Sequence, residues 1–377
     1  MNDCANFINS RQVPYQGDGI NISIIDTGID SNHLDLYGKV IAQISFVNET
    51  YGFDSDEVED ERDYNGHGTH CAGIAAGTGF ASPAGYNLTG IAPKAKLLNA
   101  KCLSKFGEGY LSGVLAAIEW SLKQKASIIS MSLGFSSSDP DHPICRAVDQ
   151  AVNNGTVVVV AAGNSGPFFS TIASPGAARG VLTVGACDKN GTITSFSSRG
   201  PTLLGYPDPD IIAPGLNILS VAASNSILGK IQQLENEYVY GLFYNNYMVL
   251  SGTSMACPMV AGAAAILLSA FPNLNPYQLR IALMKGAKSL GYSTNIEGAG
   301  LIDVKKSYNI LKNASPNFNI TTVLPKSIPI PPNSYSIFPG SQYTENVIIL
   351  SGTKINMSVE CTGNISQFII LQNNTNN

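Results

Sequence analysis

The sequence has little charge and no excess of basic residues. Of its 377 residues, 22 are Lys or Arg and 27 are Asp or Glu, which gives a formal net charge of −5. A protein that binds nucleic acid or an anionic membrane through its surface field needs a basic patch. The composition therefore predicts neither of these partners.

Long apolar runs are also absent. The longest, AGAAAILLSAF at residues 261–271, is shorter than the roughly 20 residues that span a bilayer, so it predicts a buried helix and no membrane span. The first residues do not show the charged start, apolar stretch and cleavage site of a secretory signal. A signal removed earlier, a truncated sequence and an intracellular protein all stay open.

Cysteine is present but is not arranged as zinc or redox motifs. No CxxC pair occurs, and the odd number leaves at least one thiol free in a monomer. We expect most of the thiols to act as small buried apolar groups. The seven residues are Cys4, Cys71, Cys102, Cys145, Cys187, Cys257 and Cys361.

Apolar, β-branched runs alternate with helical patterns along the first three quarters of the chain. Runs this continuous are typical of strands buried on both faces of a parallel sheet. The pattern predicts an α/β fold with a doubly wound, mostly parallel sheet flanked by helices. The predicted strands are 20–26, 95–101, 126–133, 156–163 and 181–187, and the predicted helices between them are 112–125 and 144–155.

A change of texture near residue 314 predicts a domain boundary. Before it lie two further helical patterns, NPYQLRIALMKGA and IDVKKSYNILKN. After it, the Pro-rich LPKSIPIPP precedes short alternating runs with turn residues between them. We expect one large domain over residues 1–313 and a small β-rich appendage over 314–377 that is possibly incomplete.

Three polar side chains stand at turns where such a sheet would bind a ligand. Asp26 ends the first predicted strand in IIDTGID, His67 lies between glycines in NGHGTHCAG, and Ser254 precedes an apolar helix in SGTSMACP. Ligands of open parallel sheets meet the carboxyl ends of the strands. Each residue also has a structural explanation, as a turn former or a helix cap. The two histidines of HGTH would also suit zinc, but the glutamate of HExxH is absent.

Asp26, His67 and Ser254 follow the chain order known from subtilisin. Over about residues 19–303 the chain resembles the subtilisin-like serine peptidases, through DTGID, NGHGTHCAG and SGTSMACP in the order of that family. SFSSRGP and PDIIAPG are similar to the versions in pyrolysin-like archaeal and bacterial members. The family usually has a histidine where Met259 stands, and this change concerns local packing.

The resemblance implies a role for each matching residue. Ser254 would attack the scissile carbonyl, His67 would transfer the proton, and Asp26 would orient His67 and stabilise its charged form. Asn164 in AAGNSG would donate to the oxyanion together with the backbone N–H of Ser254. A turn asparagine is the alternative for Asn164.

The resemblance also implies a substrate groove. One segment would pair with extended substrate as an added strand, and a second would help wall the pocket for the residue before the cut bond. The small, apolar walls predict a roomy pocket without a charge, and hence a broad endopeptidase that prefers apolar or aromatic residues there. A tripeptidyl-type exopeptidase and a catalytically silent polypeptide-binding or adhesin relative are the alternatives. The predicted substrate-binding residues are Ser132, Leu133, Gly134, Ala161, Ala162 and Gly163.

Several expectations concern groups beyond the catalytic residues. The acidic segment FDSDEVEDERDYNG before His67 suits either a solvated loop or a structural calcium site, and catalysis is expected to need no cofactor. The resemblance implies polypeptide substrates, an extracellular or cell-surface location, and a propeptide that this sequence does not include. Cys257 and Cys71, close to Ser254 and His67, are expected to be buried inert thiols, with sensitivity of the activity to thiol reagents as the alternative.

Overall fold

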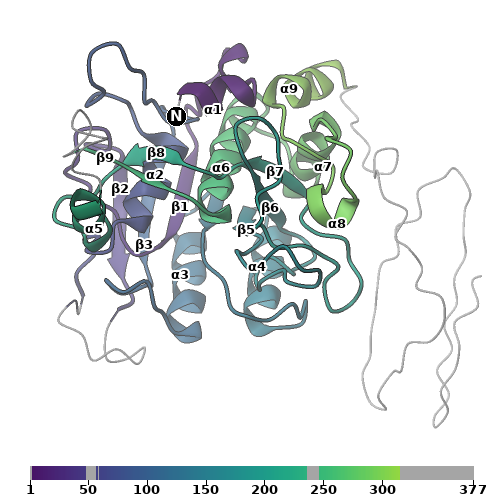
Figure 1. The fold of residues 1–377 in the computed structure, drawn as a ribbon, viewed down its shortest axis with the longest axis horizontal. Helices are drawn as coiled ribbons and strands as arrows, with labels where there is room; N and C mark the ends of the chain where they lie inside the picture. Colours follow the sequence, from purple (N-terminus) through teal and green to yellow (C-terminus); the bar gives the residue numbers. More distant parts are fainter. Residues whose placement is uncertain (1, 48–56, 58, 236–245, 315–377) are drawn as a thin grey trace, which may run out of the picture. The chain divides into compact units, whose positions relative to one another are not determined.

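The computed structural model describes residues 2–47, 57, 59–235 and 246–314 (Figure 1). Within them lies a seven-stranded sheet in the order β2-β3-β1-β4-β5-β6-β7, and all six strand pairings are parallel. This confirms the predicted doubly wound sheet. The strands are β1 (Asn21–Asp26), β2 (Val40–Ser45), β3 (Lys96–Lys101), β4 (Ile128–Met131), β5 (Val157–Ala161), β6 (Leu182–Cys187) and β7 (Ile211–Pro214).

The strand order reverses at β1, which pairs with β3 on one side and with β4 on the other. Chains that leave the two sides of such a strand run to opposite faces of the sheet and open a crevice at its carboxyl end. Asp26 is the last residue of β1. The topology therefore places this carboxylate at the natural ligand-binding position of the fold.

Helices cover both faces of the sheet (Figure 1). One buried cluster joins the strands to α2 (His67–Ala76), α6 (Thr253–Ala270) and α7 (Pro276–Gly286), and a second joins them to α3 (Leu111–Lys123) and α4 (Pro143–Asn153). Neighbouring strand residues alternate between the clusters, because successive side chains point to opposite faces. The remaining elements are α1 (Asn2–Phe7), η1 (Ser10–Gln12), α5 (Ile227–Glu235), α8 (Thr294–Glu297), α9 (Val304–Asn313) and the antiparallel pair β8 (Ile218–Val221) and β9 (Tyr247–Leu250).

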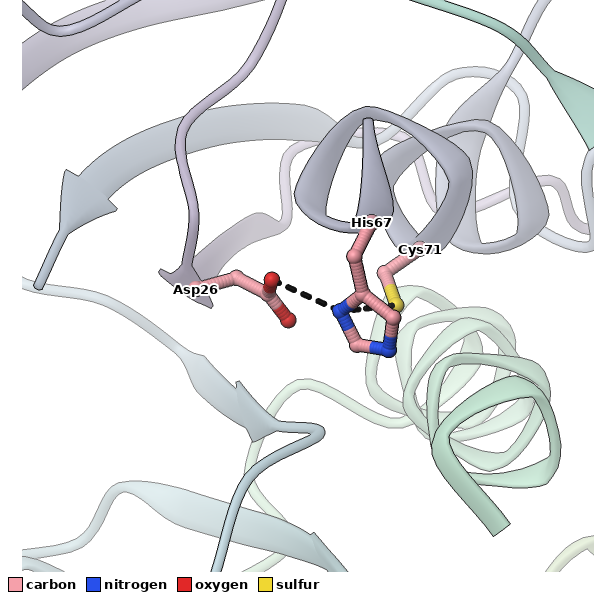
Figure 2. A group of neighbouring side chains, drawn as sticks. All are labelled: Asp26, His67 and Cys71. Carbon is pink, nitrogen blue, oxygen red and sulfur yellow. Dashed lines mark hydrogen bonds and ion pairs between the residues drawn. The ribbon is translucent and has the colours of Figure 1, made fainter. Parts of the chain in front are cut away.

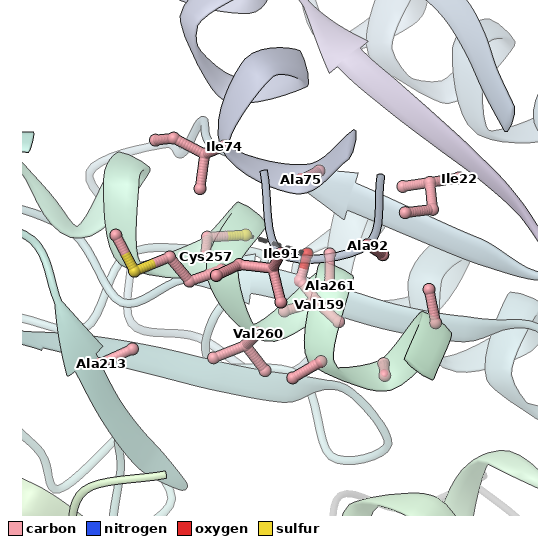
Figure 3. Close-up of a cluster of buried hydrophobic side chains, with 14 of the residues drawn as sticks. Ile22, Ile74, Ala75, Ile91, Ala92, Val159, Ala213, Cys257, Val260 and Ala261 are labelled. Carbon is pink, nitrogen blue, oxygen red and sulfur yellow. Dashed lines mark hydrogen bonds between the residues drawn. The ribbon is translucent and has the colours of Figure 1, made fainter. Parts of the chain in front are cut away.

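Helix α6 is the central helix of the first cluster (Figure 3). Its 18 residues are long and apolar enough to cross a membrane by length and composition, but 83% of them are buried inside the protein, as a core helix requires. A β-carbon added to Gly262 would lie 2.7 Å from Cβ of Ile91, so this glycine allows the helix to pack closely. Met259 is fully buried in the same helix.

Two expectations about the rest of the chain have different outcomes. The six cysteines within the described residues are buried, which confirms the expectation for those six. The predicted appendage at 314–377 lies outside the described residues except for Ala314, so it stays a prediction, and Cys361 falls in the same range.

Candidate active site

Asp26 is buried at the end of β1, with 1% of its surface exposed. Its Oδ1 accepts a hydrogen bond from the backbone N–H of Thr27 at 2.8 Å and lies 2.8 Å from Nδ1 of His67 (Figure 2). A carboxylate at this nitrogen fixes the tautomer in which Nδ1 carries the proton and Nε2 is free to accept one. The pair therefore has the geometry of a general base and its orienting acid.

His67 is the first residue of α2, and the glycines on both sides of it allow the helix to begin at this position. Gly66, just before the helix, has φ +108°, a conformation that L side chains rarely adopt. A β-carbon on Gly68 would lie 2.2 Å from the backbone oxygen of Gly28. The helix can therefore begin against the turn that follows Asp26, which brings the imidazole to the carboxylate.

The pKa of His67 results from two opposing effects. Burial of the ring lowers the pKa, whereas the negative charge and hydrogen bond of Asp26 raise it. The carboxylate prevails, and the pKa of His67 lies well above the ordinary value of 6.5. The pair thus stabilises the imidazolium that a general base becomes when it accepts a proton.

Thr27 and Asp63 connect the two members of this pair. Thr27 Oγ1 donates to Asp63 Oδ1 at 2.9 Å and accepts from the backbone N–H of Gly68 at 2.9 Å. Asp63 also accepts from the N–H groups of Gly66 at 2.7 Å and Thr69 at 2.8 Å. Our sequence reasoning assigned neither residue to the site. The sequence signal that could have identified them is the place of Thr27 within DTGID and of Asp63 four residues before His67.

Ser254 is the second residue of α6 and is half-buried. Its Oγ donates to the backbone oxygen of Ser132 at 3.2 Å, and among the described residues no hydrogen bond joins it to His67. Catalytic hydrogen bonds are often long or absent without substrate and form in the complex. Cys71 lies between the two residues. Its Sγ is 3.9 Å from Nδ1 of His67 (Figure 2) and 3.4 Å from the backbone oxygen of Ser254.

Asn164 is held beside Ser254 by Thr253. Its Oδ1 accepts from the backbone N–H of Thr253 at 2.9 Å and from the hydroxyl of the same residue at 3.0 Å. These bonds fix the orientation of the amide and leave the Nδ2 hydrogens as donors. The N–H of Ser254 belongs to the first turn of α6, where N–H groups have no partner within the helix. Both donors are of the kind that an oxyanion requires.

A pocket of about 440 Å³ joins these residues to the predicted substrate segments. None of the described residues that line it is acidic, basic or histidine. Ala162 is not one of them, because it follows Ala161 and points to the opposite face of the sheet, into the second cluster. The lining residues include Asn164, Ser254 and five of the six predicted substrate-binding residues, namely Ser132, Leu133, Gly134, Ala161 and Gly163.

The structure argues against zinc at HGTH. His70 is fully buried, and its Nε2 lies 3.0 Å and 3.1 Å from the backbone oxygens of Ile218 and Met248. It therefore faces β8 and β9, while His67 faces Asp26. Within the described part of the chain, one group of three side chains could hold a metal ion, and it consists of Asp26, His67 and Cys71, which includes the acid–base pair.

Three described acids of the segment before His67 are engaged by protein groups. Glu57 pairs with Lys101 at 2.8 Å and Asp60 pairs with Arg62 at 2.6 Å, and Asp63 makes the bonds given above. These three carboxylates do not fit a calcium ion as they stand. The calcium prediction stays a prediction, and Asp54 and Asp56 of the same segment lie outside the described residues.

Known proteins resemble this chain over the part that builds the site. The sequence profile of the subtilase family, peptidase S8, matches residues 17–300. Serine protease AprX of Bacillus subtilis (strain 168) is 40% identical over 310 residues, a match that covers 77% of this chain and 66% of AprX. Subtilisin DY of Bacillus licheniformis is 38% identical over 294 residues, covering 77% of this chain and 91% of that protein. The chain thus spans slightly less than two thirds of AprX and most of subtilisin DY.

A solved structure is similar in fold as well as in sequence. The crystal structure of a cold adapted subtilisin-like serine proteinase has a TM-score of 0.58 and 30% sequence identity. The match covers 77% of this chain and 89% of that one.

Proposed function

The chain belongs to the subtilase family of subtilisin-like serine endopeptidases, and from this premise we propose that it cleaves polypeptides through an acyl-enzyme at Ser254. The observation that carries the proposal is the Asp26–His67 contact of 2.8 Å, beside a helix start that presents Ser254 to an uncharged pocket. Each role in the reaction has a protein group to perform it, so the proposed mechanism uses no cofactor.

The proposed reaction begins when Ser254 Oγ attacks the scissile carbonyl carbon. His67 Nε2 accepts the hydroxyl proton, and Asp26 stabilises the resulting imidazolium. Asn164 Nδ2 and the N–H of Ser254 donate to the oxyanion of the tetrahedral intermediate. The imidazolium then protonates the leaving amine, the C–N bond breaks, and a water molecule activated by His67 hydrolyses the ester. The time course of ester hydrolysis tests the acyl-enzyme. A burst of released product at the start would support it, whereas strictly linear release under slow deacylation would oppose it.

We propose broad specificity with a preference for apolar or aromatic residues before the cut. The pocket volume of about 440 Å³ lies in the range of sites that enclose a large side chain. The described lining residues offer no countercharge to a lysine or aspartate side chain. Peptides that differ only at this residue should show a higher kcat/KM for phenylalanine or leucine than for lysine or aspartate. Preference for a charged residue would contradict the assignment of this pocket.

An exopeptidase that releases tripeptides is the alternative mode of action. An acetylated amino terminus distinguishes the two, because an endopeptidase needs no free amine. We expect acetylated and free forms of one long peptide to be cleaved at the same internal bonds. Cleavage of the free form alone, three residues from its start, would support the exopeptidase.

We also propose that the enzyme acts outside the cell or at its surface, which the similarity to subtilisins supports. Fractionation of the producing cells, followed by activity-based labelling, tests this location. Labelled protein in the medium or on the surface is the expected result. Labelled protein confined to the cell interior would oppose it.

A further inference from the structure

Lys101 is a fully buried lysine next to the catalytic pair. It ends β3 in register with Asp26 of β1, and its side chain has no exposed surface. Its Nζ donates to the backbone oxygens of Thr27 at 2.8 Å and Arg62 at 3.0 Å, and it lies 2.8 Å from Oε2 of Glu57. An ammonium group has three N–H donors, and three oxygens surround this one.

These oxygens belong to the segments that carry the catalytic residues. Thr27 directly follows Asp26, while Glu57 and Arg62 precede His67 by ten and five residues. The chain just beyond Lys101 is also attached to the same turn, because the N–H of Cys102 donates to the backbone oxygen of Asp26 at 2.9 Å. The position of Asp26 relative to the start of α2 therefore depends on the groups around this ammonium.

The surroundings of Nζ have the chemistry of a cation site. Backbone carbonyls and a carboxylate are the oxygen ligands that calcium takes in proteins. The ring of Tyr64 adds a face whose centroid lies 5.7 Å from Nζ, within the range of a cation–π contact. The acidic segment that predicts calcium from sequence thus supplies one of its carboxylates to a lysine.

We infer that Lys101 is a positioning residue, whose ammonium group takes the place of a bound cation and holds the segment before His67 against the turn after Asp26. This rests on the proposed peptidase function. Lys101 does not contact the substrate in this account. It acts through the geometry of Asp26 and His67.

Replacing Lys101 by methionine in the full chain tests the inference. Methionine keeps much of the apolar stem and removes the charge, so the three oxygens lose their shared partner. A fluorophosphonate probe counts the functional sites, and kcat is expressed per labelled site well below the unfolding temperature. We expect kcat to fall roughly 10- to 100-fold with KM within about twofold, because small misplacements of catalytic groups reduce rate more than binding. A purely structural role would lower the unfolding temperature without changing kcat per labelled site.

Lys123→Met is the matched control. Lys123 also pairs with a carboxylate, that of Glu119 at 2.6 Å, but it lies on an exposed helix face. The Lys123→Met variant should leave kcat unchanged.

A second variant serves if Lys101→Met does not fold. Glu57→Gln keeps the ammonium group of Lys101 and removes its countercharge, and we expect kcat to fall at least about threefold. Values of kcat per site within twofold of the parent, in Lys101→Met or its replacement, would overturn the inference.

Added calcium tests whether the ammonium group of Lys101 takes the place of a bound cation. In Lys101→Ala the shortened side chain leaves the carbonyls and Glu57 around an open space. Millimolar calcium chloride should raise kcat of this variant more than that of the parent. An equal effect on both would overturn the cation equivalence. Failure of the proposed function is distinguishable from either result, because the parent itself would then neither hydrolyse peptides nor be labelled at Ser254.

Discussion

At the scale of single residues, the proposed mechanism depends on the charge balance between Asp26 and His67. The free enzyme must hold His67 neutral to use it as a base, yet Asp26 favours the charged ring. Because the pKa of His67 is raised, the acidic limb of kcat/KM should lie above the pH expected of an isolated histidine. The same carboxylate lowers the energy of the imidazolium in the transition state.

Asp26→Asn should separate these two effects. Loss of the carboxylate removes the group that raises the pKa of His67, so the acidic limb should move to lower pH. The fall in kcat should be about 10⁴-fold, the size reported for the corresponding change in a Ser-His-Asp protease. Measurement of kcat/KM against pH in both proteins tests this. An acidic limb at the same pH in both proteins would show that Asp26 does not raise the pKa of His67.

Asn164→Ala should slow turnover by about 10²- to 10³-fold with little change in KM, as in the subtilisin example of an oxyanion-hole asparagine. The control is Asn87→Ala, a change at an exposed residue in a loop outside the pocket. Steady-state kinetics on a peptide substrate test the prediction. A rise in KM with kcat unchanged would assign Asn164 to substrate binding alone.

At the scale of elements, His70 attaches α2 to the β8–β9 pair. Its Nε2 lies within hydrogen-bond distance of one backbone oxygen from each strand, and burial lowers its pKa to about 3. The folded protein therefore resists protonation of this ring, whereas the unfolded chain accepts a proton near pH 6.5. The stabilisation from neutral His70 is complete above about pH 6.5 and is lost as the pH falls towards 3.

His70→Gln should remove this contribution. One proton taken up on unfolding corresponds to a slope of about 1.4 kcal/mol per pH unit, so the parent should lose stability more steeply than the variant over that range. Urea unfolding at several pH values measures the difference, with His142→Gln as the control for a change of histidine on the other face of the sheet. Parallel curves for parent and His70→Gln would contradict the assignment.

Sequence patterns predicted five of the seven strands of the sheet and missed β2 and β7. The runs that became β1, β3, β4, β5 and β6 are continuous because both faces are covered. β2 was not predicted, because it is an edge strand in which partly buried and exposed residues alternate, and β7, although buried, is a short run that ends in a proline. Motif order supplied Asp26, His67 and Ser254. Lys101 could not be predicted, since the oxygens around it come from segments brought together only by the fold.

At the scale of the whole molecule, one hydrophobic cluster of described residues runs from the first described helix to the last. Val304 N–H donates to the backbone oxygen of Ile8 at 2.9 Å, and α9 packs on α7 and the residues of η1. The first and last described helices thus complete one hydrophobic cluster. The catalytic residues all lie between these helices in the sequence.

A chain that ends at Ala314 should therefore fold and hydrolyse small peptides. We expect its kcat/KM to lie within about twofold of the full chain, because the described site takes no residue from beyond position 314. Circular dichroism and peptide hydrolysis of both proteins test this. A folded but inactive short chain would show that residues 315–377 contribute to catalysis, whereas an unfolded one would show that they contribute to stability.

Covalent labelling tests the central claim most directly, namely that Asp26, His67 and Ser254 act as one catalytic unit. Purified protein is incubated with a fluorophosphonate probe, and the modified residue is identified by peptide mass mapping. We predict labelling at Ser254 that is lost in His67→Ala. A folded parent that is not labelled, or labelling of Ser254 that persists without His67, would contradict the account.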